Sequence, residues 1–438
     1  MLHKESIIPK SFPLIKKETS SSWDSLARKA VLTKFEGLTT GRLTVVEGKE
    51  VVHFGNPTPD FQISAAIKVL DTRMYSEIIT KGLNGAAEAY IRGWWTCDDL
   101  TSLIRIFIRN RHLADKLEGG LSKAASWIFS LLHSMRRNTR QNSLRNITAH
   151  YDLGNEFFST FLDETRMYSC AIFESESSSL EQASICKIER ICQKLELSPD
   201  DHVLEIGTGW GGFAIHAAKH YGCRITTTTI SQKQYDYARQ RVQAAGLNER
   251  IQVIKEDYRD LTGQYDKLVS IEMIEAVGHH YFDHFFRKCS DLLHPEGRML
   301  LQGIIIVDHL YEEAKQFADF IKTYIFPGSC IPSISSLCDS VAKTTDMRLF
   351  HLEDITPHYA TTLNHWRRRF MENILQIRKQ GFSEEFIRLW NFYFCYCEGG
   401  FLERQIGDVQ MIFTKPLCRM DPVLPALNAR TPMEGINQ

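Results

Sequence analysis

The sequence has no long run of apolar residues. Its longest apolar stretches, such as Ala124 to Leu132 and Gly303 to Val307, are far shorter than the roughly 20 residues of a membrane-spanning helix. No apolar core follows the basic residues near the N-terminus, so a secretory leader is not predicted either. We therefore expect a soluble protein, or one that attaches only to the surface of a membrane.

The sequence also lacks a metal-binding pattern and an excess of charge. Its 11 cysteines are scattered, and no second pair or histidine set joins Cys395 and Cys397 in the spacing of a zinc site. We expect a cytoplasmic protein with no bound metal. The net charge of -1 gives no overall attraction to nucleic acid or acidic lipid, so no nucleic-acid partner is predicted.

The chain is long enough for more than one domain. It has 438 residues, of which 43% are hydrophobic and 24% are charged, as in globular proteins. In the first part, the patterns predict a helix over 23–35, a hairpin over 42–54, a strand over 61–70 and a helix over 83–95. We predict an α+β domain over 1–110, a basic linker over 111–145, an α/β domain over 146–420 and a tail over 421–438.

One short stretch, from Val203 to Gly212, organises the rest of the chain. Residues His202 to Ile206 are apolar enough for a parallel strand buried on both faces, and helical spacing follows from Phe213 to Ala218. The glycines between them let the chain bend tightly and let a ligand contact the backbone. Glu205 supplies a carboxylate at the end of the strand.

This stretch has three interpretations. Gly207, Gly209 and Gly212 fit the dinucleotide pattern G-x-G-x-x-G, which would indicate a nicotinamide enzyme. That interpretation expects an acidic residue about 20 positions later, whereas the strand predicted over Arg224–Ile230 ends in threonine and isoleucine. An acidic residue before the first glycine is instead similar to methyltransferases that use S-adenosylmethionine (SAM). A purely structural glycine turn is the third interpretation.

Predicted strands and helices alternate from Asp201 to Val307. This order is typical of a doubly wound, mostly parallel sheet with helices on both faces, where ligands bind beyond the carboxyl ends of the strands. We therefore expect one crevice to be bordered by residues 205–209, 229–231, 256–258, 272–275 and 302–304.

Further motifs surround this sheet. They are His150 to Phe158, Met167 to Phe173, Thr229 to Gln234, Asp257 to Asp260, Glu272 to Gly278 and Tyr324 to Gly328. Together they resemble the cyclopropane fatty acid synthase family, including its mycolic-acid-modifying relatives. The resemblance runs from about His150 to Pro416, and a weaker one to the N-terminal domain of longer members covers Gly41 to Arg111.

The resemblance implies transfer of a methylene group from SAM to the cis double bond of an acyl chain in a membrane phospholipid. The residues that it places around SAM are Tyr168, Ser169, Gly207, Gly209, Thr229, Ile230, Gln234, Asp257 and Tyr258. Two of them have a structural alternative. Gln234 lies three residues after Ser231, as in a helix capping box, and Tyr258 fits ordinary packing.

This chemistry needs a second set of residues. An alkene is a poor nucleophile, so the protein must align it with the sulfonium methyl group and exclude water, which would capture the carbocation as an alcohol. A base must then remove a proton from the transferred methyl group so that the ring closes. The resemblance implies a bound bicarbonate as this base, held by Cys170, Glu275, Gln302, Tyr359 and the backbone of Ile304.

Two positions depart from many family members, which carry histidine where this chain has Gln302 and Ala276. A glutamine amide donates to an anion but does not change protonation near neutral pH, so we expect an anchor and not a proton shuttle. A lone cysteine is usually a small buried apolar group, but the pattern of Tyr168, Ser169 and Ala171 around Cys170 favours a site role as a wall or an anchor and not as a nucleophile. Glu275, at an apolar strand end, would need a partner if buried, which favours a functional role.

We therefore predict a SAM-dependent cyclopropane-fatty-acyl-phospholipid synthase with an α/β catalytic domain and a smaller α+β N-terminal domain that binds lipid or serves assembly. Two alternatives stay open. One is a related enzyme whose product is methyl-branched or hydroxylated, and the other is a lipid-binding protein with a degenerate site. The oligomeric state is also open, with a homodimer among the options.

Two basic stretches are expected to place the protein on the bilayer surface. The linker carries Arg136, Arg137, Arg140 and Arg145, and the stretch from His365 to Phe370 sets three arginines between two aromatic residues. Each basic residue near an anionic membrane contributes about 1 kcal/mol, so four together would matter. The alternative is a solvated linker and a solvated helix face.

Overall fold

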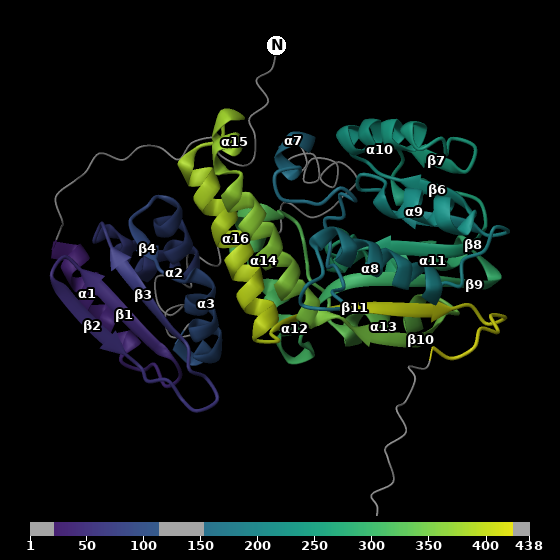
Figure 1. Ribbon diagram of the computed structural model, residues 1–438. Helices are drawn as coiled ribbons and strands as arrows, with labels where there is room; N and C mark the ends of the chain where they lie inside the picture. The colour runs from purple at the N-terminus through teal and green to yellow at the C-terminus, as the bar shows by residue number, and fades with distance from the viewer. Residues whose placement is uncertain (1–21, 114–152, 424–438) are drawn as a thin grey trace, which may run out of the picture.

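The computed structural model describes residues 22–113 and 153–423. Two β-sheets lie toward opposite ends of the molecule, and helices α14 (Thr356–Glu372) and α16 (Glu384–Leu402) lie between them (Figure 1). No helix within these two ranges is both long and apolar enough to cross a membrane. The linker arginines 136, 137, 140 and 145 lie outside the described residues.

Residues 22–113 form what we call the N-terminal module. Helix α1 (Ser22–Phe35) and the hairpin of β1 (Arg42–Glu47) and β2 (Glu50–Phe54) confirm the predicted elements. Strand β3 (Ser64–Val69) pairs in parallel with β1, and β4 (Trp95–Cys97) pairs antiparallel with β3. The strand order is therefore β2-β1-β3-β4.

Helix α2 (Arg73–Ile91) differs from the helix predicted over residues 83–95. It begins earlier, is broken at Gly82 with φ 61° and ψ -136°, and ends before Gly93, whose φ is 76°. The prediction that the helix continues through Trp95 was wrong, because the turn at Gly93 delivers that residue into β4. Trp95 is nonetheless buried.

The last helix of the module is α3 (Leu100–Arg109). The Asp99 carboxylate accepts a hydrogen bond of 3.0 Å from the backbone N–H of Ser102, as expected of a helix cap. One face of α3 is buried, including Leu103 and Ile104.

The second sheet confirms the predicted doubly wound, mostly parallel architecture. Its strand order is β10-β11-β9-β8-β5-β6-β7, and β9, β8, β5, β6 and β7 are parallel neighbours. The antiparallel strands β11 and β10 extend it past the last predicted strand. The strands are β5 (His202–Ile206), β6 (Arg224–Thr228), β7 (Ile251–Ile254), β8 (Tyr265–Ile271), β9 (Leu293–Ile306), β10 (Arg348–Asp354) and β11 (Ile406–Thr414).

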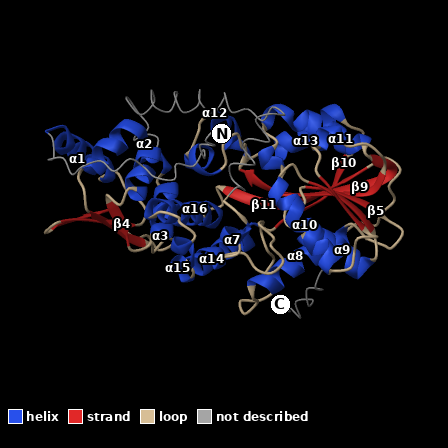
Figure 2. Ribbon diagram, turned by 90° about the horizontal axis from the view of Figure 1, so that it is seen from above, coloured by secondary structure: helices blue, strands red, loops and turns tan. Residues whose placement is uncertain are grey.

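Helices cover both faces of this sheet. Seen from above, α8 (Leu180–Lys194), α9 (Gly212–Tyr221) and α10 (Gln232–Ala244) lie on one side, and α11 (Phe282–Asp291) and α13 (Ile334–Thr344) lie on the other (Figure 2). The shorter elements are α7 (Asn155–Phe158), the 3-10 turns η1 (Tyr258–Asp260), η2 (Ile274–Ala276) and η3 (His279–Tyr281), α12 (Asp308–Gln316), the π-helical turn η4 (Ile321–Ile325) and α15 (Ile374–Lys379).

The central helices α14 and α16 join the N-terminal module to the large sheet. Their apolar side chains share one buried core with those of the module. Arg388 on α16 donates to the backbone carbonyls of Tyr90 and Trp95 at 2.5 and 2.7 Å, and the Thr101 hydroxyl donates to Glu398 at 2.9 Å. Buried polar groups paired in this way fix how the two parts pack together.

The stretch from His365 to Phe370 lies on α14 and does not form an apolar, basic docking patch. Trp366 and Phe370 are fully buried, at 1% and 0% exposure. Arg369 donates to the carbonyl of Leu162 at 2.9 Å, and Arg367 lies 3.7 Å from the carboxylate of Glu398. The expected exposed aromatic residues are therefore absent from this stretch, because the helix turns them toward the core, whereas a role of its arginines at a bilayer surface stays a prediction.

Candidate active site

A cavity of about 600 Å³ begins at the carboxyl ends of the parallel strands and reaches the N-terminal module. All the predicted site residues except Cys170 and Gln302 line it. They are Tyr168, Ser169, Gly207, Gly209, Thr229, Ile230, Gln234, Asp257, Tyr258, Glu275, Ile304 and Tyr359. The strand ends thus border one crevice, as the alternating pattern predicts, and its size is typical of a small-molecule site.

The three glycines of the G-x-G-x-x-G pattern have different reasons to be glycine. Gly207 and Gly209 border the cavity with φ of 106° and 52°, and a Cβ at Gly209 would meet nothing of the protein within 4 Å. A Cβ at Gly212 would instead lie 2.6 Å from the carbonyl oxygen of Thr165. Gly209 therefore leaves room for a ligand, Gly207 provides the positive φ of the turn beside Met273, and Gly212 allows close packing.

Glu205 ends β5 inside the wall of the cavity and is 3% exposed. Its carboxylate lies 2.5 Å from the hydroxyl of Thr227, which also lies 2.7 Å from the hydroxyl of Thr208. Burial raises the pKa of Glu205 to about 8. The end of β5 thus carries a buried carboxyl group directly beside the glycine turn, where a ligand with polar hydrogens would bind.

Ser231 and Gln234 only partly fit the capping box. The Ser231 hydroxyl accepts a hydrogen bond from the backbone N–H of Gln234 at 3.4 Å, so it caps α10. The side chain of Gln234 does not bond back to Ser231. Its Oε1 accepts a hydrogen bond of 2.9 Å from the hydroxyl of Thr229, and both residues line the cavity. Gln234 is therefore a wall residue as well as part of the capped turn.

Aromatic and charged residues close the same end of the cavity. Asp257 is paired with Arg259 at 2.5 Å, and the ring of Tyr258 packs edge-on against Phe285 with centroids 5.4 Å apart. Tyr168 shares a hydrogen bond of 3.1 Å with the hydroxyl of Tyr393 on α16. These contacts position the predicted SAM-binding side chains before any ligand binds.

A group of three acids, which we call the acidic cluster, lies farther along the cavity. Glu272 and Glu275 are half-buried and line the cavity, whereas Asp408 is fully buried and does not line it. Glu272 is the centre of the cluster. Its Oε1 accepts hydrogen bonds from the backbone N–H of Cys170 at 2.7 Å and from Nε2 of Gln302 at 2.9 Å. Its Oε2 accepts the hydroxyl proton of Tyr359 at 2.5 Å. Three donors therefore converge on one carboxylate.

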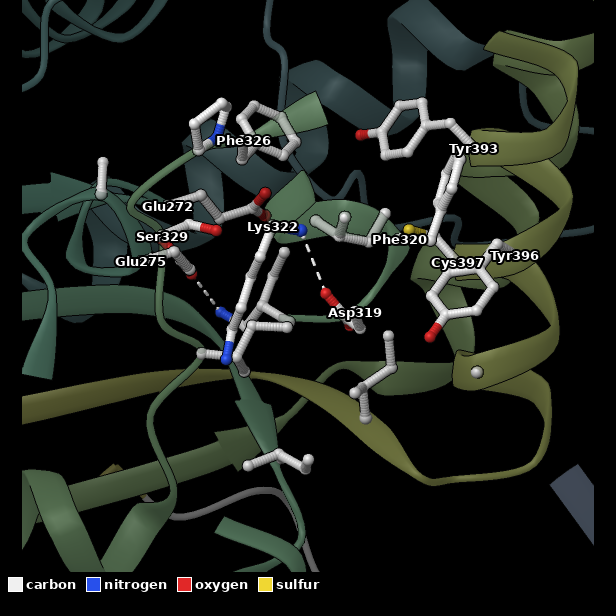
Figure 3. Close-up of a pocket in the computed structure, with 18 of the residues that line it drawn as sticks. Glu272, Glu275, Asp319, Phe320, Lys322, Phe326, Ser329, Tyr393, Tyr396 and Cys397 are labelled. Atoms are coloured by element: carbon white, nitrogen blue, oxygen red, sulfur yellow. Dashed lines mark hydrogen bonds between the residues drawn. The ribbon is translucent and has the colours of Figure 1, made fainter. Parts of the chain in front are cut away.

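Glu275 is held differently. Its Oε1 accepts the backbone N–H of Ile304 at 2.5 Å, while its Oε2 is buried with no hydrogen-bond partner in the described structure. Burial and the nearby carboxylate of Glu272 raise the pKa of Glu275 to about 8. Figure 3 shows both glutamates at the same side of the pocket, opposite Tyr393, Tyr396 and Cys397 of α16.

The third acid of the cluster, Asp408, lies on β11. Its Oδ2 accepts a hydrogen bond of 3.0 Å from Nε2 of Gln302, and burial followed by the charge of Glu272 raises its pKa well above the ordinary value. Lys187 is fully buried close by and donates to the Ser169 hydroxyl at 2.7 Å. Desolvation lowers the pKa of Lys187 to about 8, while the carboxylates oppose this change.

Cys170 and Gln302 therefore stand behind Glu272, away from the cavity wall. Both are 0% exposed, and both use their donors on the Glu272 carboxylate. Each of the four donor groups predicted to hold bicarbonate thus already donates to a glutamate: Cys170, Gln302 and Tyr359 donate to Glu272, and the backbone of Ile304 donates to Glu275, the fifth predicted residue. In this chain the same donors therefore do not also fit a bicarbonate ion.

The other end of the cavity is apolar and is formed by the N-terminal module. We call it the apolar arm, and its lining side chains are Phe35, Ile67, Ile78, Leu100, Leu103, Ile104, Phe107 and Ile108. No motif in the sequence predicts this wall, because its residues look like ordinary core positions until the module is packed against α16. Such a surface suits a hydrocarbon chain.

Polar contacts tie the two ends of the cavity together. The hydroxyl of Tyr324 in η4 donates to Glu88 on α2, and Lys81 donates to the same carboxylate at 2.7 Å. Asn84, just after the break in α2, donates to the carbonyl of Ala318 at 3.1 Å. The bend of α2 at Gly82 therefore brings polar groups of the module against the turn that lines the catalytic side.

Sequence reasoning did not select Glu272, Asp408 and Lys187 as site residues. Glu272 was within reach, because it lies at a predicted strand end only three residues before Glu275. Asp408 and Lys187 are separated from the glycine motif along the chain, and only the folded sheet places them beside Glu272. Asp408 is the single charged residue of β11, which is a weak signal in the sequence, whereas Lys187 lies among other charged residues of α8 and gives no such signal.

Comparisons with known proteins agree with this geometry. The family model of mycolic acid cyclopropane synthetases matches residues 138–411. Tuberculostearic acid methyltransferase UfaA1 of Mycobacterium tuberculosis is 37% identical over 331 residues, covering 73% of this chain and 76% of that protein. Cyclopropane-fatty-acyl-phospholipid synthase of Escherichia coli is 33% identical over 355 residues, covering 80% of this chain and 88% of that protein.

Solved structures show the same relationship. Mycolic acid cyclopropane synthase CmaA1 complexed with SAH and CTAB is similar with a TM-score of 0.59 and 31% identity, covering 62% of this chain and 98% of that one. Cyclopropane synthase MmaA2 from Mycobacterium tuberculosis gives a TM-score of 0.58 at 31% identity, with the same coverage.

Proposed function

Because the chain belongs to the mycolic acid cyclopropane synthetase family of SAM-dependent lipid cyclopropane and methyl transferases, we propose that it forms a cyclopropane ring on an unsaturated acyl chain of a membrane phospholipid. The observation that carries this proposal is the shared cavity. One continuous space joins the glycine turn, the acidic cluster and the apolar arm. A methyl donor, a proton acceptor and a hydrocarbon chain can meet there.

The glycine turn is the proposed SAM site. Gly207 and Gly209 allow the cofactor to approach the backbone, and Glu205 and Gln234 offer polar atoms beside it. When bound there, SAM supplies an electrophilic methyl group. The chain itself holds the cofactor so that the methyl group faces the acidic cluster. This matters because an alkene is a weak nucleophile and reacts only when it is aligned with the methyl group.

The apolar arm is the proposed acyl site. Its aliphatic and aromatic side chains exclude water from around the double bond, which matters because water would convert the carbocation into an alcohol. The N-terminal module would therefore take part in binding the substrate. The phospholipid bilayer is the proposed source of that chain, and the apolar arm supports this by offering a lipid tail an alternative to the membrane interior.

The product class has a second candidate, which is a methyl-branched chain. The observation in its favour is the 37% identity to a protein named as a tuberculostearic acid methyltransferase. Converting the carbocation into a saturated methyl branch would require a hydride donor as well as SAM, whereas ring closure only requires a base. The acidic cluster supplies a base, so we favour the ring.

The test is to incubate the full-length protein with SAM and vesicles of a phospholipid with one cis double bond per acyl chain. We expect S-adenosylhomocysteine to accumulate and the acyl chains to gain one methylene while losing the alkene, as measured by mass spectrometry and proton NMR. Vesicles of the saturated phospholipid are the matched control. Cofactor consumption that does not depend on the double bond would refute the proposal.

A further inference from the structure

We propose that the carboxylate of Glu272 occupies the place of an external anion and is itself the base that takes the proton from the transferred methyl group. This inference rests on the proposed function, since it names the proton acceptor of the same reaction. The turnover of this chain would then need no bicarbonate.

The hydrogen bonds around Glu272 carry the argument. A planar anion with two oxygens is held by the backbone N–H of Cys170, by Nε2 of Gln302 and by the hydroxyl of Tyr359, at 2.7, 2.9 and 2.5 Å. A carboxylate and a bicarbonate ion present the same pair of oxygens, so one set of donors can hold only one of them. Here the anion is part of the chain.

Gln302 fits this arrangement. Its Nε2 donates to both Glu272 and Asp408, at 2.9 and 3.0 Å, and its Oε1 accepts from Gln410 at 3.1 Å. The amide is therefore locked as a donor toward the two acids. The amide of Gln302 cannot take up a proton near neutral pH, whereas the carboxylate of Glu272, to which it donates, can.

The backbone at Glu272 gives an independent reason. Its φ is 48°, in the left-handed region that residues other than glycine, asparagine and aspartate rarely adopt. A glutamate held there by three hydrogen bonds, in the wall of the cavity, is a strained position at a functional site.

Glu272 keeps room to accept a proton. An ionised carboxylate offers about four acceptor positions, and three are used, two on Oε1 and one on Oε2. Oε2, which Tyr359 contacts, is the oxygen with fewer of these donors, and Asp408 also lies within side-chain hydrogen-bond reach of this carboxylate. Both Glu272 and Tyr359 line the cavity, so a substrate carbon can approach this oxygen.

The proposed step balances without any further reactant. The bond from sulfur to the methyl carbon breaks with its electron pair staying on sulfur, and the π pair of the alkene forms the first new carbon–carbon bond. One C–H bond of the transferred methyl group then breaks. Its proton goes to Glu272, and its electron pair closes the ring. Glu272 later returns the proton to solvent.

Two variants of the full-length protein test this role. Glu272→Gln keeps the shape of the side chain but removes the base, and its amide can still accept from Cys170 and Gln302. Glu272→Gly removes the carboxylate, and glycine adopts the positive φ without strain. We expect each to lower kcat by at least about 100-fold with little change in SAM affinity, as for removal of a general base.

Added anions then separate an internal base from an external one. In bicarbonate-free buffer the wild-type protein is expected to keep full turnover on monounsaturated phospholipid vesicles. Sodium bicarbonate or sodium formate should raise the kcat of Glu272→Gly at least about 10-fold, because the donors of Cys170, Gln302 and Tyr359 then have room for an anion. The same anions should not raise the kcat of Glu272→Gln. Sodium chloride at equal ionic strength is the control.

The outcomes are distinct. A wild-type protein that is active only with bicarbonate would overturn this inference while leaving the proposed function intact. Full activity of Glu272→Gln would also overturn it. A wild-type protein that modifies no acyl chain under any buffer would instead refute the proposed function. SAM calorimetry and thermal unfolding of both variants show whether a loss of turnover comes from the base or from the fold.

Discussion

The two ends of the cavity are built on opposite principles. The acidic cluster is a set of half-buried and buried carboxyl groups, and its central member, Glu272, accepts hydrogen bonds from Cys170, Gln302 and Tyr359. The apolar arm consists of aliphatic and aromatic side chains of the N-terminal module. Under the proposed function, the acidic end determines where a proton is accepted and the apolar end determines which acyl chain binds. Changes at each end should therefore affect different measurements.

The largest effect is expected at the cofactor side. Gly209→Val should weaken SAM binding on the order of 1,000-fold, or about 4 kcal/mol, because its side chain would enter the space left for the ligand. Gly246→Val is the matched control, since Gly246 also has a positive φ and open space but lies outside the cavity. Calorimetry should show normal SAM binding by this control. Equal losses in both variants would indicate backbone strain alone.

The next effect concerns the pH dependence of stability, which Glu205 should change and a residue of the apolar arm should not. Burial raises the folded-state pKa of Glu205 from 4.5 to about 8. Its stabilising contribution is therefore complete below the unfolded-state pKa and is lost as pH rises through about 8, because the unfolded state ionises first.

We expect Glu205→Gln to gain about 3 kcal/mol of stability relative to wild type between pH 5 and pH 8, measured by urea unfolding. Phe107→Leu, in the apolar arm, should leave the pH dependence unchanged. A constant difference between Glu205→Gln and wild type across this range would contradict the raised pKa.

A smaller effect is expected on the choice of acyl chain. Phe107→Leu removes part of the wall of the apolar arm, so the ratio of kcat/KM between long and short acyl chains should change by about 10-fold. Phe54→Leu is the control, because Phe54 and Phe107 both contact Phe35 with ring centroids 5.7 Å apart, but only Phe107 lines the cavity. The same selectivity in both variants would mean that the arm does not hold the chain.

The sequence predicted the two ends unequally. Strand β5 was predicted residue for residue, and the family resemblance was correct, because glycine turns and buried parallel strands leave local patterns. The acidic cluster was predicted only in part. Glu275 and Gln302 were found through the resemblance, whereas the pairing of Gln302 with Asp408 depends on the register of β9 with β11.

The apolar arm could not be predicted, for a physical reason. Residues such as Leu103 and Ile104 have the periodicity of any helix that packs on a core, and only the position of the module against α16 leaves them facing a cavity. Gly82 carried a weak signal, since a glycine inside a helix often marks a break, but not what the break is for.

The smallest effect is expected where the two ends are tied together. Tyr324→Phe removes the hydrogen bond to Glu88 and should cost about 1 kcal/mol of stability, measured by urea unfolding, with SAM affinity unchanged. Tyr311→Phe is a comparison on nearby α12, whose tyrosine does not line the cavity. A loss of SAM affinity in Tyr324→Phe would show that the two ends are not independent.

The most direct test of the central claim is to follow the hydrogens of the transferred methyl group. The protein is given SAM with a fully deuterated methyl group and vesicles of a monounsaturated phospholipid, and the acyl products are analysed by mass spectrometry and deuterium NMR. The account predicts a cyclopropane that has lost one deuteron of the methyl group, because a base inside the dry cavity removes it. A product that keeps all three deuterons, as a hydroxylated or saturated methyl-branched chain would, contradicts it.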